Sequence, residues 1–321
     1  MRADLAALGL ALLAGACAAP APVERATESL APSPPPPVVA DAGDAADAGE
    51  EAGAVSEAGD ADHAACGVGD GGGEDAEAHA ALGGFPEQLD LRDGNDELGV
   101  VSVPLGAREP RPIVVALHGG SERPERACSA WRRVTDAYPF VVCPRGWGGN
   151  ERRLGWKNAA DTGRRIARAL AATKSAFGAW IQDTPSIVLA GFSMGAVQVA
   201  LLARRAPQTY RRIVIGDAAH NPRSALTFAH AWVEGGGERA LFMCTTSGCE
   251  PSMRAAARKV ALAKGAARLN IAPTQKHALS EPVVQSLRRD WPWLVEGAEG
   301  WDGYAPPTGE LPGKTETFEP R

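Results

Sequence analysis

The sequence predicts one α/β domain built on a mostly parallel sheet, preceded by a long segment that cannot fold by itself. From about residue 98, short apolar runs of strand length alternate with helical patterns rich in Ala, Leu and Arg. Several runs, such as Ile-Val-Val-Ala-Leu at 113–117, are apolar at every position, which indicates burial on both faces of the sheet. Helices are therefore expected on both faces of one central sheet.

The expected elements alternate regularly along the chain. The expected strands cover residues 98–103, 113–117, 140–143, 186–190, 212–216, 239–245 and 267–271. The expected helices cover residues 161–177, 194–205, 224–234, 252–263 and 281–289. No internal repeat is visible, so we assign residues 81–321 to one domain with one core.

The first 19 residues have the pattern of an export signal. A short charged start is followed by an apolar run and then by small residues. The run is shorter than the roughly 20 residues that a membrane-spanning helix needs. Cys17, after Leu13-Ala-Gly-Ala16, resembles the lipidated cysteine of a bacterial lipoprotein, although Ala14 stands where a bulky residue is usual. The alternative is a plain signal peptide cleaved near Ala16.

Residues 20–80 form an acidic segment rich in Pro, Ala, Gly and Asp, and we expect it to be a disordered linker. It has no aromatic residue and almost no large aliphatic one, so it cannot offset the entropy lost on ordering. The segment carries fourteen acidic residues and only Arg25 as a base. Since the whole chain is −6 and residues 1–19 are neutral, residues 81–321 carry a net charge of +7.

A domain with this much positive charge raises the question of nucleic-acid binding. Its arginines are scattered in pairs along the expected helices without interleaved aromatic residues, so no nucleic-acid partner is expected. We expect a monomer that contacts a membrane only through an N-terminal lipid anchor.

The six cysteines are compatible with an oxidising compartment. Cys128 and Cys143 flank one helix-to-strand passage, and Cys244 and Cys249 bracket one short loop. We expect two local disulfides, and the alternative is four buried thiols. Cys66 lies in the linker and has no evident partner.

The strongest chemical motif is Gly191-Phe-Ser193-Met-Gly195 between an apolar run and a helical pattern. This is a nucleophile elbow in the strand–turn–helix context that it requires. The turn is so tight that the residues two before and two after the serine must be glycines. Ser193 is therefore the candidate nucleophile, and the alternative is an inert serine in a tight turn.

A second motif, Leu117-His118-Gly119-Gly120, follows the expected strand 113–117. Glycines there let backbone N–H groups approach a substrate oxygen, as in the oxyanion hole of serine hydrolases. We therefore expect the amides of Gly119, Gly120 and Met194 to form that hole. His118 is expected to orient the loop, and an ordinary glycine turn is the alternative.

The general base is expected to be His277, which lies in the loop after the last expected strand. Nucleophile, acid and histidine follow in that order in this class of hydrolase. His220 is a weaker choice, His230 lies within an expected helix, and His63 and His79 lie in the linker.

Two carboxylates compete for the acid that orients the histidine. The usual position is the loop after the strand at 239–245, where Glu250 precedes Pro251, and we expect Glu250 there. The alternative is Asp217, directly after the strand at 212–216. A Ser–His dyad is the third possibility.

Together, the elbow at 191–195, the His118-Gly-Gly loop and His277 make residues 98–295 resemble the α/β-hydrolase superfamily. The similarity is to dienelactone hydrolases, carboxylesterases and secreted polyester-depolymerase-like esterases. The resemblance implies a mostly parallel sheet, a Ser-acid-His triad, and no cofactor or metal. The chain lacks the family's Gly-x-x-Asp pattern after the seventh strand, which is why the acid stays open.

The expected function is that of an exported or envelope-anchored serine esterase acting on a small-molecule or polymeric ester through an acyl-enzyme. The alternatives are a serine peptidase of the same fold and an inactive hydrolase-fold binding lipoprotein. Trp147, Trp156 and Trp232 line the pocket or pack in the core, with core packing expected for any one of them.

Overall fold

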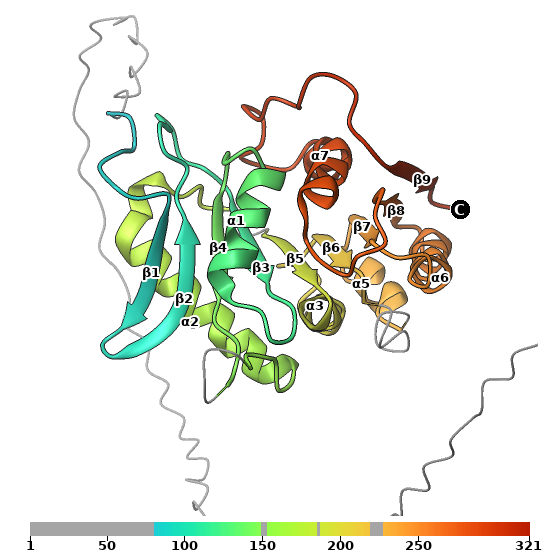
Figure 1. The fold of residues 1–321 in the computed structure, drawn as a ribbon, viewed down its shortest axis with the longest axis horizontal. Helices are drawn as coiled ribbons and strands as arrows, with labels where there is room; N and C mark the ends of the chain where they lie inside the picture. The colour runs from blue at the N-terminus through green and yellow to red at the C-terminus, as the bar shows by residue number, and fades with distance from the viewer. Residues whose placement is uncertain (1–79, 149–152, 185–186, 219–226) are drawn as a thin grey trace, which may run out of the picture. The chain divides into compact units, whose positions relative to one another are not determined.

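The computed structural model describes residues 80–148, 153–184, 187–218 and 227–321 (Figure 1). The leader, Cys17, Cys66, His220 and residues 20–79 of the linker lie outside these ranges. Within the described ranges no helix combines the length and apolarity needed to cross a membrane.

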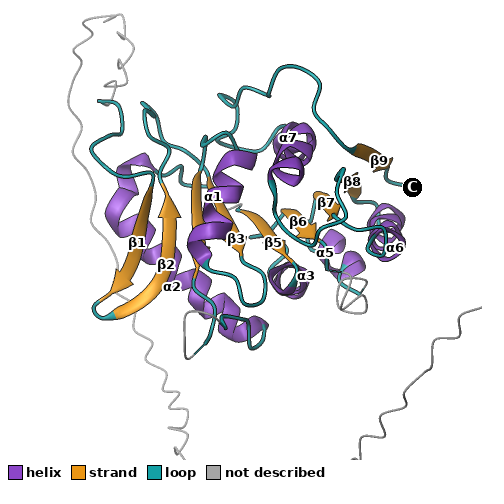
Figure 2. Cartoon of the chain, viewed as in Figure 1, coloured by secondary structure: helices purple, strands orange, loops and turns teal. Residues whose placement is uncertain are grey.

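One nine-stranded sheet forms the centre of the domain, in the order β1-β2-β4-β3-β5-β6-β7-β8-β9 (Figure 2). The six strands from β4 to β8 in this order are parallel, and β1, β2 and β9 are antiparallel to their neighbours. The strands are β1 Gln88–Asp93, β2 Asp96–Ser102, β3 Ile113–Leu117, β4 Phe140–Pro144, β5 Val188–Phe192, β6 Arg212–Gly216, β7 Arg239–Cys244, β8 Ala266–Ile271 and β9 Lys314–Phe318.

Helices cover both faces of this sheet. They are α1 Pro124–Val134, α2 Ala159–Phe177, the short 3-10 helix η1 Gly178–Trp180, α3 Met194–Arg205, α5 Ala229–Glu234, α6 Glu250–Leu262 and α7 Glu281–Val295. Apolar side chains of α1 and α7 share one core with one face of the sheet, and Trp131 and Trp291 are fully buried there. Side chains of α2, α3, α5 and α6 share a second core with the opposite face.

The strand residues explain this two-sided burial. Every residue of β3, β4, β5 and β6 is buried, as their unbroken apolar composition predicts. Each such strand buries side chains on both faces, worth about 25 cal/mol for each Å² of apolar surface removed from water.

The sequence prediction of an α/β-hydrolase type of sheet is confirmed. Two edge strands were not expected: β1 reads Gln-Leu-Asp-Leu-Arg-Asp and β9 reads Lys-Thr-Glu-Thr-Phe. Both are polar edge strands, so their sequences lack the apolar signal of the central strands. The helix α1 agrees with the helix expected on the Cys128 side of the passage to the strand at Cys143, and Pro124 at its start and the buried Ala127, Cys128 and Trp131 give it an amphipathic pattern.

Candidate active site

Ser193 occupies a strained turn between β5 and α3. Its φ and ψ are 53° and −118°, a region that side-chain-bearing residues rarely adopt. A Cβ atom on Gly191 would lie 2.7 Å from the backbone of Gly195, and one on Gly195 would lie 2.3 Å from the carbonyl oxygen of Leu117. The two glycines are therefore required by space, and the turn lifts Ser193 beyond the carboxyl end of the strand.

His277 lies over this serine. Its Nε2 is 2.9 Å from Oγ of Ser193, although the two residues are 84 positions apart in the chain. The imidazole also packs against the ring of Phe192, with ring centroids 4.8 Å apart. His277 stands in the loop between β8 and α7, so the loop places it above the end of β5.

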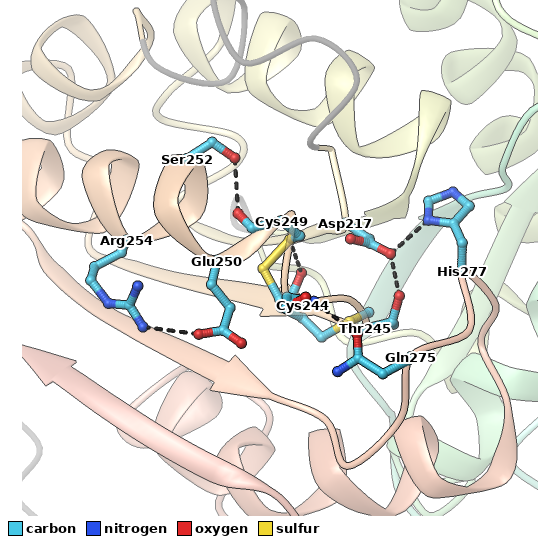
Figure 3. Close-up of a disulfide and its surroundings, with 11 residues drawn as sticks. Asp217, Cys244, Thr245, Cys249, Glu250, Ser252, Arg254, Gln275 and His277 are labelled. Carbon is cyan, nitrogen blue, oxygen red and sulfur yellow. Dashed lines mark hydrogen bonds and ion pairs between the residues drawn. A yellow bond between two sulfur atoms is a disulfide. The ribbon is translucent and has the colours of Figure 1, made fainter.

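Asp217 holds the other side of the imidazole. Its Oδ2 is 2.6 Å from Nδ1 of His277, and the side chain is only 1% exposed (Figure 3). Asp217 directly follows β6 with a φ of 50°, and its N–H donates to the carbonyl oxygen of Met243. Because a carboxylate only accepts hydrogen bonds, Nδ1 carries the hydrogen and Nε2 is the basic atom facing Ser193.

The loop from Cys244 to Cys249 supports both Asp217 and the histidine loop. The hydroxyl of Thr245 donates to Oδ2 of Asp217, and both side chains are buried. The N–H of Ser247 donates to the side-chain oxygen of Gln275, two residues before His277, at 3.1 Å. This loop therefore contacts the acid directly and the histidine loop through Gln275.

Glu250 is not placed to act on His277, and the expectation that it is the acid is corrected. It is the first residue of α6, and its carboxylate pairs at 3.2 Å with Arg254, one helical turn later. Figure 3 shows the Glu250 side chain on the far side of the Cys244–Cys249 disulfide from the imidazole. The helix start directs the carboxylate toward its own i+4 neighbour.

One of the three amides expected to form the oxyanion hole, that of Gly119, has another partner in the structure. The N–H of Gly119 donates at 2.8 Å to the carboxylate of Glu122, so this amide is already occupied. In the described part of the chain, the N–H groups of Gly120 and Met194 have no acceptor. Met194 begins α3 directly after Ser193, where first-turn N–H groups have no partner in their own helix.

His118 is buried beneath this loop and holds it in place. Its Nε2 accepts from the N–H of Gly146 at 3.0 Å, so Nδ1 carries the hydrogen that it donates to the carbonyl oxygen of Gly119 at 2.7 Å. Burial lowers the pKa of His118, and the charge of Arg145 lowers it further, while the bond to Gly119 opposes both. His118 is therefore a neutral support, and its ring packs on Trp156 with centroids 4.7 Å apart.

The tryptophans named from the sequence take different roles. Trp232 is fully buried in the core, and Trp156 donates from its indole N–H to the carbonyl oxygen of His118. Trp147 is 51% exposed and carries the ammonium of Lys157 over its ring. None of the three is among the residues that line the cleft at Ser193.

A cleft of about 760 Å³ opens at Ser193 and His277. Its walls come from the loop after β3, one side of α1, and the loop that leads into α7. The lining residues are Gly119, Gly120, Ser121, Glu122, Arg123, Arg126, Ser129, Ala130, Arg133, Phe192, Ser193, His277, Ala278, Leu279, Ser280 and Glu281. This volume lies within the range of clefts that bind small molecules.

Both expected disulfides are present, Cys128–Cys143 between α1 and β4 and Cys244–Cys249 at the end of β7. Asp217 and the sulfurs of Cys244 and Cys249 lie within 4.8 Å of one another. The bonded sulfurs are not thiolates, so this group is not a metal-ligand set.

No protein-family model matches the chain, and no curated protein matches it in sequence. The chain is similar in structure to Est1E from Butyrivibrio proteoclasticus, at 13% identity and a TM-score of 0.47, over 65% of this chain and 99% of that one. The same protein with ferulic acid bound gives 14% identity and a TM-score of 0.46, over 61% and 94%. The esterase PE8 gives 16% identity and a TM-score of 0.42, over 58% and 94%.

Proposed function

We propose that this protein is a serine hydrolase that cleaves carboxylic esters through an acyl-enzyme on Ser193. The observation that carries the proposal is the continuous relay from Ser193 to Asp217, with 2.9 Å from Oγ to Nε2 of His277 and 2.6 Å from Nδ1 to the aspartate. A nucleophile, a base within hydrogen-bond reach and a buried group that orients the base are the parts that acyl transfer needs.

The relay defines where the proton goes. As Ser193 Oγ attacks the ester carbonyl carbon, its proton passes to Nε2 of His277, and the imidazolium is stabilised by the carboxylate of Asp217. The histidine then gives this proton to the leaving alkoxide, which departs as the alcohol. Water, activated by the same Nε2, attacks the acyl carbon, and the carboxylic acid is released as Ser193 regains its proton.

The negative oxygen of the tetrahedral intermediates is assigned to the N–H groups of Gly120 and Met194. These amides have no other acceptor in the described part of the chain, whereas that of Gly119 already donates to Glu122. One donor of this kind is worth about 3–4 kcal/mol of transition-state stabilisation. The hydrogen bond between Gly119 and Glu122 fixes the loop that presents Gly120.

A fluorophosphonate probe tests the proposal directly. The wild-type protein is expected to be labelled on Ser193, and the Ser193→Ala variant is expected not to be labelled. Ser129→Ala, which removes another hydroxyl of the same cleft, is the matched control and should label like the wild type. A folded wild-type protein that resists the probe and hydrolyses no ester would instead be a binding protein on a hydrolase scaffold.

Comparing a p-nitrophenyl ester with the p-nitroanilide of the same acyl group separates an esterase from a peptidase. The two substrates form the same acyl-enzyme, so any difference in kcat arises at the acylation step. Because the ester is intrinsically more reactive, the deciding observation is the anilide: clear, Ser193-dependent hydrolysis of the anilide would assign the protein to the peptidases, and hydrolysis of the ester alone supports an esterase.

The proposal includes export, with Cys17 as a lipid anchor. Two disulfides in the folded domain support an oxidising compartment, and the apolar leader precedes Cys17. Metabolic labelling with palmitate should mark the wild-type protein but not Cys17→Ser. Recovery of full-length, unlabelled wild-type protein from the cytoplasm would contradict both export and lipidation.

A further inference from the structure

One side of α1 supplies the cleft with basic side chains. Arg123 precedes the helix, and Arg126 and Arg133 follow on the same side, with Ser129 and Ala130 between them. At 100° and 1.5 Å per residue, positions 126 and 133 lie on one stripe about 10 Å apart. Arg126 and Arg133 therefore line the cleft from the same side of α1.

The other charged residues of the cleft are committed to protein groups. Glu281, across the cleft at the start of α7, pairs with Arg133. Glu122 accepts the N–H of Gly119. Arg126 is exposed, and no ion pair or hydrogen bond links its guanidinium to any described residue. The positive charge of Arg126 is thus not neutralised on the side of the cleft that α1 forms, called here the α1 wall.

The position of these arginines opposes the stability of the helix. Arg123 and Arg126 stand at the N-terminal end of α1, where the helix dipole is positive and favours acidic side chains. Glu125, the acidic residue of this first turn, lines a separate hollow with Arg145 rather than the cleft at Ser193, and Arg123 borders both. Helix stability therefore gives no reason for a basic residue at Arg126, on the cleft side of this turn, whereas an anionic ligand would.

We propose that the preferred substrate is an ester carrying a carboxylate or a comparable anionic group, bound by Arg126 together with Arg123 while its ester bond lies at Ser193. The inference rests on the proposed ester hydrolysis and names the substrate class of that site. A guanidinium binds a carboxylate through two parallel hydrogen bonds, and the positive end of α1 adds to the attraction.

Two pairs of isosteric substrates test the proposal on either side of the ester bond. The first pair compares mono-p-nitrophenyl adipate with the p-nitrophenyl ester of adipamic acid, so a carboxylate replaces a carboxamide on the acyl side. The second compares 4-acetoxybenzoate with 4-acetoxybenzamide, which moves the charge to the alcohol side. We expect kcat/KM to favour the carboxylate by about tenfold in at least one pair, and 0.5 M NaCl to reduce this ratio.

Variants of Arg126 test whether this residue causes the preference for the carboxylate, measured as the carboxylate-to-carboxamide ratio of kcat/KM. Arg126→Gln should lower the carboxylate-to-carboxamide ratio by about threefold to fivefold, and Arg126→Glu should reverse the preference. Arg108→Gln is the matched control, because Arg108 is exposed, lies outside the cleft and changes the net charge equally. Its ratio should equal that of the wild type. Circular dichroism establishes that each variant is folded.

The failure of this inference is distinguishable from the failure of the proposed function. A wild-type enzyme that hydrolyses both members of each pair equally, or prefers the carboxamides, keeps the esterase assignment and overturns the anionic preference. If neither pair is hydrolysed, calorimetric titration of Ser193→Ala with monomethyl adipate and with methyl adipamate still decides the inference. Tighter binding of the carboxylate, lost in Arg126→Glu, supports it, and equal binding overturns it.

Discussion

Asp217 Oδ2 and His277 Nδ1 lie 2.6 Å apart across a separation of 60 residues, and the carboxylate is buried behind the imidazole. The same oxygen accepts the hydroxyl of Thr245, so its position is fixed from two directions. The carboxylate that contacts His277 therefore follows β6, and a residue of the loop after β7 supports it.

Asp217→Asn is expected to lower kcat by a factor on the order of 10³–10⁴ with little change in KM, because the amide no longer stabilises the imidazolium. Steady-state kinetics on a short p-nitrophenyl ester measures this. Glu250→Gln is the matched carboxylate control and should change kcat less than twofold, since Arg254 keeps Glu316 as an ion-pair partner at 2.6 Å. The opposite ranking of the two variants would return the acid to Glu250.

Thr245→Val should lower kcat by about tenfold, because it removes the hydrogen bond that fixes the acid while nearly preserving side-chain volume. A bond to a charged group is worth about 1.5–3 kcal/mol, so a lower free energy of unfolding is expected as well. Thr245→Ser, which keeps the hydroxyl, should recover most of the kcat. Thr246→Val serves as the control in the same loop. Equal kcat values for Thr245→Val and Thr245→Ser would show that the hydroxyl does not position Asp217.

The two disulfides should differ in what their removal changes. Replacing Cys244 and Cys249 by Ala loosens the loop that contacts Asp217 and Gln275, so kcat should fall, with a stability loss of about 2 kcal/mol. The Cys128–Cys143 disulfide closes a longer loop, so replacing both cysteines by Ala should lower the free energy of unfolding by about 3 kcal/mol. The loss of kcat should be smaller than for the first pair. Urea unfolding and single-substrate kinetics on both double variants give the comparison. A greater loss of kcat on removing Cys128–Cys143 would contradict the supporting role of the Cys244–Cys249 loop.

The central strands, the elbow and the position of His277 follow from local sequence patterns. The buried strands are apolar throughout, and Gly191 is needed because a Cβ there would meet the backbone of Gly195 within the same turn, whereas Gly195 is needed because a Cβ there would meet the backbone of the neighbouring strand end at Leu117. The strand composition and the glycine spacing can be recognised from the sequence without the three-dimensional contacts, and chain order points to His277. The sequence was therefore sufficient to predict them.

The choice between Asp217 and Glu250 depends instead on three-dimensional placement. Both residues follow a strand and precede His277, so chain order cannot separate them. A signal was nevertheless present: Glu250, followed by Pro251 and four residues before Arg254, has the pattern of a helix start with an i,i+4 ion pair. The bond from Gly119 to Glu122 had a comparable signal, an acidic residue three positions after a glycine N–H at a turn.

The buried imidazole of His118 makes the stability of the fold depend on pH. Burial holds the pKa of this imidazole below its ordinary value near 6.5, since charging it in the core is costly and would break its bond from the N–H of Gly146. Above about pH 6.5 the histidine is neutral in both the folded and the unfolded chain, so its stabilising contacts are fully present. Below that pH the unfolded chain takes up a proton that the folded chain does not, and stability falls until the folded pKa is reached.

His118→Gln should therefore reduce the dependence of the unfolding free energy on pH below 6.5, by up to about 1.4 kcal/mol per pH unit. At pH 7.5 the variant should be less stable than the wild type by about 2 kcal/mol, because Gly146 loses its ring acceptor. The difference between the two proteins should consequently narrow as the pH falls. Urea unfolding at intervals from pH 7.5 to pH 5.0 measures both curves. Parallel curves over this range would mean that His118 is protonated equally in the folded and unfolded chains, and the neutral support of the Gly119 loop would have to be abandoned.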